Sequence, residues 1–186
     1  MFAKEIVKEA GDYILAHMQE ELHIERKSSP TDLVTRLDKE VQNFLIDKIR
    51  SQYPDDQFCA EEGCLRASVG HGSVWVIDPI DGTNNFVAQG DDFAIMVAYF
   101  ENGVGQFGII YDVMKGHCYH GGGAFQACLN EELLPNFKDK PLRDFLIASN
   151  AGMLETNAWG VAELANASLG VRIYGSAAIS FSKILS

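Results

Sequence analysis

The chain has 186 residues, of which 47% are hydrophobic and 10% aromatic, so it can bury a substantial core. Its 26 acidic and 15 basic residues give a net charge of -11 at pH 7, which excludes the basic surface of a direct nucleic-acid binder. The sequence shows neither a signal-peptide pattern nor an apolar run of membrane-spanning length, so we expect a cytoplasmic protein without a membrane partner.

Apolar residues at spacings of three and four predict two amphipathic helices within residues 3–52. The first covers residues 3–22, and Ser28-Ser29-Pro30 breaks it. The second begins after Asp32 or Thr35 and ends at Tyr53-Pro54. Together these two helices form one predicted layer.

A mainly antiparallel sheet is predicted over residues 57–121. Short apolar runs indicate strands at 57–60, 74–77, 93–101, 104–113 and 117–119. Asn102-Gly103 separates two of these runs and is a strong signal for a two-residue hairpin turn. We interpret Gly121–Gly123 as another hairpin and not as a phosphate-binding loop.

The region 145–186 predicts the start of a second layer. Strands at 145–149 and 171–174 flank a helix at 155–167. Gly175-Ser176 opens a final helix, whose predicted buried face comprises Ile179, Phe181, Ile184 and Leu185. Helices, then an antiparallel sheet, then mixed elements indicate an α+β layered architecture in a single domain, residues 1–186.

The most informative segment is Trp75–Phe86, W-V-I-D-P-I-D-G-T-N-N-F. Asp78 and Asp81 stand three residues apart at the end of an apolar strand, where desolvation is costly unless a positive charge lies between them. Carboxylates and a carbonyl, such as that of Ile80, supply the hard oxygens that suit Mg²⁺. The segment therefore indicates a metal site.

The turn that follows could receive a phosphate group. Gly82 leaves room for close approach, and the amides of Gly82 and Thr83 would stand at a helix start, where anions are favoured. The same residue types also form ordinary surface turns, which is the alternative interpretation. An EF-hand is excluded, because Gln89 occupies the twelfth position, where a glutamate is required.

The string D-P-I-D-G-T-x-N-F resembles the signature of the inositol monophosphatase family, Mg²⁺-dependent and lithium-sensitive phosphatases of small phosphorylated metabolites. Four further segments resemble blocks of this family in the family's order. They are K-S-S-P-T-D-L-V-T with Asp38 at residues 27–38, A-E-E-G at 60–63, G-G-G-A-F at 121–125 and G-S-A-A at 175–178. The resemblance implies a layered αβαβα sandwich of the sugar-phosphatase type.

The resemblance also implies roles for particular residues, with two or three Mg²⁺ ions as the cofactor. The implied metal ligands are Glu61, Asp78, Ile80 (through its carbonyl) and Asp81, with Asp78 bridging two ions. The implied catalytic residues are Asp38, Glu61 and Thr83. The implied substrate contacts are Asp81, Gly82, Thr83, Gly175, Ser176 and Ala177.

Without the family blocks, two of these residues have ordinary interpretations. Asp38 lies within a helical pattern and would be a solvated residue, whereas Thr83 would be a helix cap. The resemblance instead implies that Thr83, hydrogen-bonded to Asp38, orients the attacking water and helps to deprotonate it. Ser176 could likewise serve as a plain N-cap of the last helix.

Family members are longer and carry a W-D-x-A-A-G motif, whose Asp is a further metal ligand. Trp75 and Trp159 precede Val76 and Gly160, so neither begins that motif. We therefore expect this chain to correspond to the N-terminal two-thirds of a family member, with the C-terminal part missing. On its own it should bind the second metal weakly and be a poor catalyst.

The expected function is Mg²⁺-dependent hydrolysis of a small phosphate monoester, inositol monophosphate or a similar polyol phosphate, by metal-activated water. The expected assembly is a homodimer. Enzymatic alternatives are the fructose-1,6-bisphosphatase, phosphoadenosine-phosphate phosphatase and NADP phosphatase activities of the same superfamily. A non-catalytic interaction protein derived from a phosphatase stays open as an alternative of another class, although the acidic balance disfavours direct RNA binding.

Overall fold

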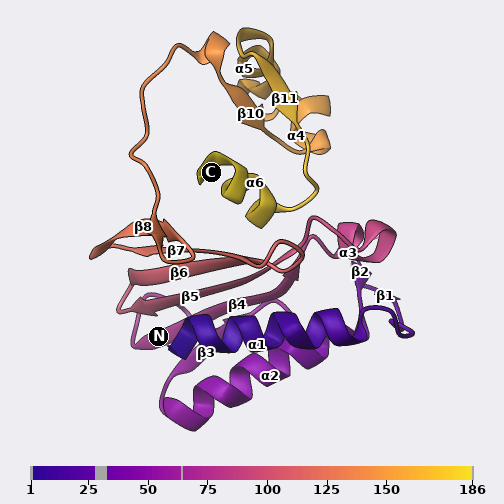
Figure 1. Ribbon diagram of the computed structural model, residues 1–186, viewed down its shortest axis with the longest axis vertical. Coiled ribbons are helices and arrows are strands. Elements are labelled where there is room, and N and C mark those ends of the chain that lie inside the picture. Colours follow the sequence, from indigo (N-terminus) through magenta and orange to yellow (C-terminus); the bar gives the residue numbers. More distant parts are fainter. Residues whose placement is uncertain (1, 28–32, 64, 186) are drawn as a thin grey trace.

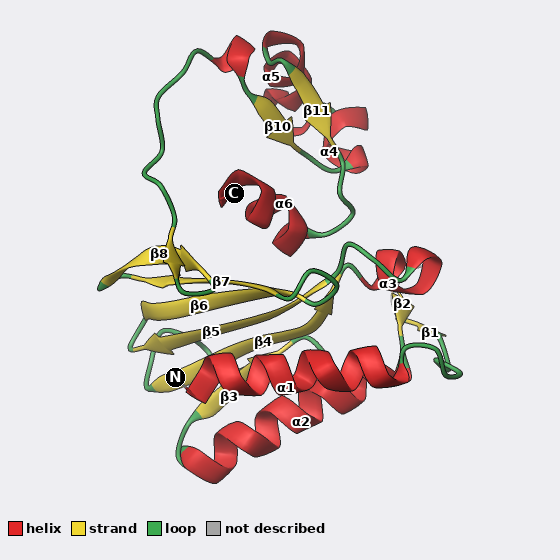
Figure 2. Ribbon diagram, viewed as in Figure 1, coloured by secondary structure: helices red, strands yellow, loops and turns green. Residues whose placement is uncertain are grey.

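The computed structural model describes residues 2–27, 33–63 and 65–185, so the predicted break at Ser28-Ser29-Pro30 lies outside the described residues. Helices α1 and α2 cover one face of a large sheet, and α6 lies against its other face (Figure 1). Beyond α6, a small parallel sheet carries α4 and α5 (Figure 2). This stacking confirms the predicted layered α+β architecture. Within the described ranges, no helix combines the length and apolar character needed to cross a membrane.

The first layer consists of α1 (Phe2–His17) and α2 (Arg36–Gln52), with a short pair of strands, β1 (Glu25–Arg26) and β2 (Leu33–Val34), between them. Helix α1 ends five residues before its predicted end. Met18 and Leu22 still pack against the core from the segment that follows, which explains why they continued the helical spacing.

Thr35 caps the N-terminus of α2 and decides between the two predicted start points. Its hydroxyl accepts a hydrogen bond from the Asp38 backbone amide, while the Asp38 carboxylate accepts one from the Thr35 amide. This reciprocal capping box satisfies two amides that the helix itself leaves unpaired. It also fixes Asp38 at the first turn of the helix.

The large sheet has seven strands in the order β3-β4-β5-β6-β7-β8-β9. Their bounds are β3 Gln57–Ala60, β4 Ser73–Asp81, β5 Ala94–Glu101, β6 Val104–Asp112, β7 His117–Gly122, β8 Phe125–Leu129 and β9 Glu132–Leu133. Strand β3 is parallel to β4, and the other neighbouring pairs are antiparallel. The sheet therefore extends beyond residue 121, the end predicted from the sequence, because β8 and β9 were missed.

Two predicted turns join strands of this sheet. Asn102 and Gly103 have φ angles of 48° and 84°, the left-handed geometry that a type I′ hairpin turn requires. Gly122 pairs with Phe125 across the β7–β8 turn, so the glycine-rich segment forms a hairpin as expected. The core lies between α1, α2 and the sheet, and its largest fully buried side chains include Ile6, Ile14, Leu37, Leu45, Ile77 and Phe93.

Strand β4 continues four residues past its predicted end at Ile77, through an irregularity. Asp78 lies opposite Met96 and Asp81 opposite Ala94, so Pro79 and Ile80 together oppose one residue of β5. Side chains three residues apart point to opposite faces of a regular strand, and the extra residue of a bulge reverses this alternation. Asp78 and Asp81 consequently share the face of the sheet that looks toward α6.

Strand β10 (Leu146–Ala148) pairs in parallel with β11 (Gly170–Arg172) in the small sheet. The single helix predicted at 155–167 is wrong. The chain forms α4 (Ala151–Glu155), a 3₁₀ turn (Ala158–Gly160) and α5 (Val161–Ala167) instead. Asn157, Trp159 and Gly160 have φ angles of 50°, 56° and 73°, which a continuous right-handed helix cannot contain.

Helix α6 (Ala177–Leu185) packs on the sheet through Ala178 and Ile179, which contact a cluster containing Ala94 and Met96. The predicted buried face is correct for Ile179 and wrong for Phe181, Ile184 and Leu185, which are 58%, 66% and 36% exposed. Phe181 and Ile184 instead line a cavity together with Ala148 and Met153.

Candidate metal and phosphate site

Asp78 has the most unfavourable environment of the predicted site residues. Its Oδ1 atom is buried and has no hydrogen-bond partner within the described part of the chain. Burial, followed by the neighbouring carboxylates of Glu61, Asp81 and Asp38, raises the pKa of Asp78 to about 9. A buried carboxylate among other carboxylates strongly favours binding a proton or a cation.

Asp81 connects the end of β4 to the beginning of α6. Its Oδ2 atom accepts hydrogen bonds from the Ser176 hydroxyl and, at 2.8 Å, from the Ala178 backbone amide. The Ser176 hydroxyl also accepts from the Ile179 amide at 3.0 Å, so Ser176 caps α6 as well as contacting Asp81. Of the three helix-start residues that the resemblance assigned to substrate, Ser176 therefore contacts Asp81 in this structure.

Asp38 and Thr83 meet at the same end of the sheet, where α2 and α3 (Thr83–Gln89) begin (Figure 1). The Thr83 hydroxyl lies 3.3 Å from Asp38 Oδ1 and 3.0 Å from the Ile80 carbonyl oxygen. Asp38 is fully buried and not solvated, and the cap of α3 is Gly82 and not Thr83. Burial raises the pKa of Asp38 to about 6, against the lowering effect of the hydrogen bonds from Thr35.

Lys27 is a neighbour of the site that the sequence interpretation did not assign. Its ammonium group donates to Glu61 at 2.9 Å and also to Glu62, whose side chain is only 9% exposed. Burial by itself lowers the pKa of Lys27, but the hydrogen bonds to Glu62 and Glu61 outweigh this effect and raise it. The signal available in the sequence was its place at the head of the K-S-S-P-T-D-L-V-T segment.

The residues fit Mg²⁺ as a partly hydrated ion and not as an ion in a rigid protein cage. No group of three or more His, Cys, Asp or Glu within residues 2–27, 33–63 and 65–185 is arranged to hold a metal. Glu61 is turned toward Lys27, and one oxygen of Asp81 is engaged by α6. Mg²⁺ commonly keeps several waters and uses one or two carboxylates plus substrate phosphate, so the unpaired oxygen of Asp78 beside Asp81 suits it.

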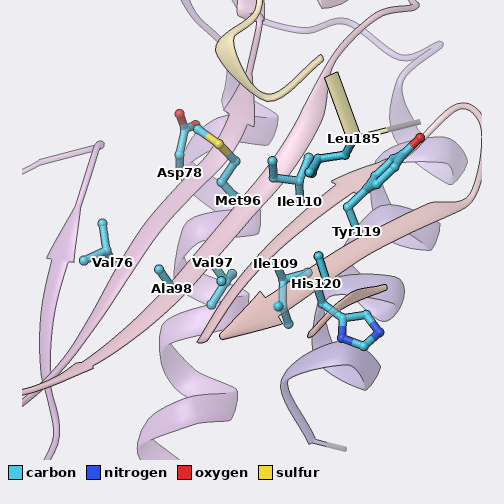
Figure 3. Close-up of a pocket in the computed structure, with 13 residues that line it drawn as sticks. Val76, Asp78, Met96, Val97, Ala98, Ile109, Ile110, Tyr119, His120 and Leu185 are labelled. Carbon is cyan, nitrogen blue, oxygen red and sulfur yellow. The ribbon is translucent and has the colours of Figure 1, made fainter. Parts of the chain in front are cut away.

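Two cavities adjoin these residues. The first, about 420 Å³, is lined mainly by apolar side chains of β4 to β7 and by Leu185. Asp78 and Met96 lie together at one end of it, on neighbouring strands (Figure 3). The second, about 560 Å³, is lined by all three predicted substrate residues of the α6 start, Gly175, Ser176 and Ala177, and by polar groups such as Asn150. Its lining is mainly apolar, but it includes more polar groups than the lining of the first cavity and therefore suits a hydroxylated ligand better.

Fold and site together define a class: a layered α+β protein in which a group of carboxylates stands beside the N-terminus of a helix. Comparison with known protein families matches residues 1–185 to the Inositol monophosphatase family. The chain belongs to this family, which confirms the resemblance in its motifs.

Known relatives are similar over almost the whole chain. The inositol-1-monophosphatase of Bacillus subtilis is 41% identical, over 98% of this chain and 71% of its own length. A crystal structure of staphylococcal IMPase-II has a TM-score of 0.85 at 35% identity, covering 98% of this chain and 67% of that one. An IMPase/NADP phosphatase complexed with Mg²⁺ and phosphate has a TM-score of 0.87 at 28% identity, covering 97% of this chain and 68% of that one.

Other similar structures contain ligands. They include staphylococcal IMPase-II bound to inositol monophosphate or to 2′AMP, and an IMPase/NADP phosphatase complexed with NADP and Ca²⁺. The relatives are inositol monophosphatases, which are phosphoric monoester hydrolases. Ligand identity differs among them, so family membership defines the reaction class and leaves the substrate open.

Proposed function

We propose that this protein takes part in Mg²⁺-dependent hydrolysis of a small phosphate monoester, with inositol monophosphate or a similar polyol phosphate as substrate. The observation that carries the proposal is the buried, unpaired oxygen of Asp78 at the bulge of β4, beside Asp81 and Glu61. A structural carboxylate would be expected to have found a hydrogen-bond donor there.

The proposed ligands of two or three ions are Glu61, Asp78, the Ile80 carbonyl and Asp81. The Ile80 oxygen and Asp38 Oδ1 share the single proton of the Thr83 hydroxyl, so the Ile80 carbonyl keeps a lone pair to offer an ion, and the proton is then free to go to Asp38. Mg²⁺ bound there would offset the charge of the phosphate and lower the pKa of a water molecule. To bind the ion, Asp78 would have to release its proton. Glu61 would have to leave the ammonium group of Lys27.

Thr83 and Asp38 would then move the proton of the attacking water. The Thr83 hydroxyl can accept that proton while it donates its own to Asp38 Oδ1. Asp38 has a pKa of about 6, so it is mainly ionised at neutral pH and ready to accept. Its other oxygen stays bound to Thr35, which keeps the carboxylate oriented.

The proposed substrate contacts are Asp81, Gly82 and Thr83 together with Gly175, Ser176 and Ala177 at the start of α6, and the substrate would lie beside the direct contact between Asp81 and Ser176. The cavity of about 560 Å³ that Gly175, Ser176 and Ala177 line has the size of an ordinary small-ligand pocket. We propose that it receives the hydroxyl groups of the substrate, with the phosphate toward Asp81.

The test is phosphate release from inositol monophosphate, fructose-1,6-bisphosphate, 3′-phosphoadenosine-5′-phosphate and NADP, each with and without Mg²⁺. We expect Mg²⁺-dependent release that is slow, in line with the weak second-metal binding expected from the sequence, greatest with inositol monophosphate and inhibited by Li⁺ at the position that Asp81 helps to build. Asp78→Asn should abolish it, whereas the exposed Asp55→Asn should not. Absence of Mg²⁺-dependent release with all four substrates would favour the non-catalytic alternative.

The proposal includes one domain over residues 1–186, a homodimer and a cytoplasmic location. The exposed apolar side chains of α6, Phe181 and Ile184, are consistent with association. Sedimentation analysis tests the dimer, which a single monomeric species at micromolar concentration would contradict. Cell fractionation tests the location, which recovery outside the cytoplasm would contradict.

A further inference from the structure

Gln42 forms a two-point contact with the segment that carries Glu61. It lies on α2, one turn after Asp38, and is only 5% exposed. Its Nε2 donates to the Glu62 carbonyl oxygen at 2.7 Å, and its Oε1 accepts from the Glu62 amide at 2.8 Å. The side-chain amide thus satisfies both backbone groups of Glu62, as a neighbouring strand would.

The rest of this segment is held from other directions. The Glu61 amide donates to the Ile77 carbonyl oxygen of β4 at 3.1 Å. The Arg66 guanidinium donates to the carbonyl oxygens of Ala60 and Glu61. The two bonds from Gln42 tie the segment that carries Glu61 and Glu62 to α2. Because α2 also carries Asp38, these bonds help to set the position of the Glu61 backbone relative to Asp38.

The position of Gln42 indicates a specific role. Gln42 belongs to the buried face of α2, together with the apolar residues Leu37, Val41 and Leu45, and a polar side chain buried on that face is costly unless both ends are bonded. A carboxamide donates to the carbonyl and accepts from the amide at the same time, which an ionised carboxylate or an apolar side chain of similar length cannot do.

We propose that Gln42 is a positioning residue for Glu61, holding the backbone of this proposed ligand in place relative to Asp38 when its carboxylate leaves Lys27 for a cation. The inference rests on the proposed function. The Lys27 ion pair holds Glu61 through its carboxylate and ends when that carboxylate is used elsewhere. The two bonds from Gln42 involve the backbone and persist.

The test compares Gln42→Met, which keeps the length and loses both bonds, with Val41→Ala, which removes buried methyl groups from the same helix. Mg²⁺ affinity is measured by titration calorimetry, thermal stability by calorimetry, and backbone exchange of the Glu62 amide by hydrogen–deuterium exchange in EDTA. Val41→Ala reports what loss of stability alone does to metal binding.

Gln42→Met should weaken Mg²⁺ binding about tenfold and speed exchange of the Glu62 amide. Val41→Ala should lower the melting temperature and change neither. Unchanged Mg²⁺ affinity in Gln42→Met, or an equal loss in Val41→Ala, would overturn the inference.

Asp78→Asn separates this inference from the proposed function. If Asp78→Asn loses Mg²⁺ while Gln42→Met keeps wild-type affinity, only the role of Gln42 fails. If the wild-type protein binds no Mg²⁺, the proposed function fails. Gln42 then has no metal ligand to position, even if Gln42→Met speeds hydrogen exchange of the Glu62 amide.

Discussion

Asp78 should make the metal-free protein lose stability as the pH rises. Its pKa moves from 3.8 to about 9 on folding, so the folded protein holds a proton that the unfolded chain has already released. The stability associated with that proton is complete below the unfolded pKa of 3.8 and is lost progressively toward pH 9. Across about three pH units, from about pH 5 to about pH 8, the loss is at most about 4 kcal/mol, since one unit corresponds to about 1.4 kcal/mol.

Asp78→Asn removes the titrating group with little change in shape. Thermal unfolding in EDTA at the two pH values should show that the melting temperature of the wild-type protein falls by up to about 8–16 °C more than that of Asp78→Asn, because about 1 kcal/mol corresponds to about 2–4 °C at this size. Asp55→Asn, an exposed change of the same kind, should follow the wild type. Parallel pH profiles for wild type and Asp78→Asn would refute the assignment of Asp78 as a buried, proton-holding carboxylate.

Three further substitutions test neighbouring contacts. Thr83→Ala should lower kcat about a hundredfold with little change in KM, while Thr83→Ser retains most activity; equal kcat for both would contradict the proposed proton transfer. Asn85→Ala removes two donated hydrogen bonds, one of 2.7 Å to the Tyr174 carbonyl, and should cost about 2 kcal/mol of unfolding free energy in denaturant titrations; a change below about 0.5 kcal/mol would contradict this. Gly82→Ala should destabilise by about 1–3 kcal/mol, because its φ is +93° and a Cβ would lie 3.0 Å from that of Ser176; an equally stable variant would show that this turn adapts.

Local signals predicted the fold well where one residue decides the geometry. The sequence limited the start of α2 to Asp32 or Thr35, of which the structure has Thr35, and Asn102-Gly103 placed the hairpin between β5 and β6. Helix 155–167 failed because the left-handed conformations at Asn157 and Trp159 are not marked by their neighbours. Strand β8 was missed because its side chains are exposed or half-exposed and show no clear alternation.

The same division applies to the candidate site. Asp78 and Asp81 stood out from spacing and residue type alone, but a spacing of three does not reveal the bulge that places them on one face. The contact between Thr83 and Asp38 joins residues 45 positions apart and was implied only by the family resemblance. Gln42 was visible in the sequence only as a polar residue on the apolar face of α2. Its role could be interpreted only from the structure, in which it bonds to the backbone of Glu62.

The most direct test of the central claim is Mg²⁺ binding measured together with proton release. Titration calorimetry at pH 7.5, in buffers that differ in ionisation enthalpy, gives both quantities. Because Asp78 holds a proton up to a pKa of about 9, Mg²⁺ binding to the wild type should release about one proton. Asp78→Asn should bind Mg²⁺ far more weakly and release none. Equal binding by Asp78→Asn, or wild-type binding without proton release, would contradict the account.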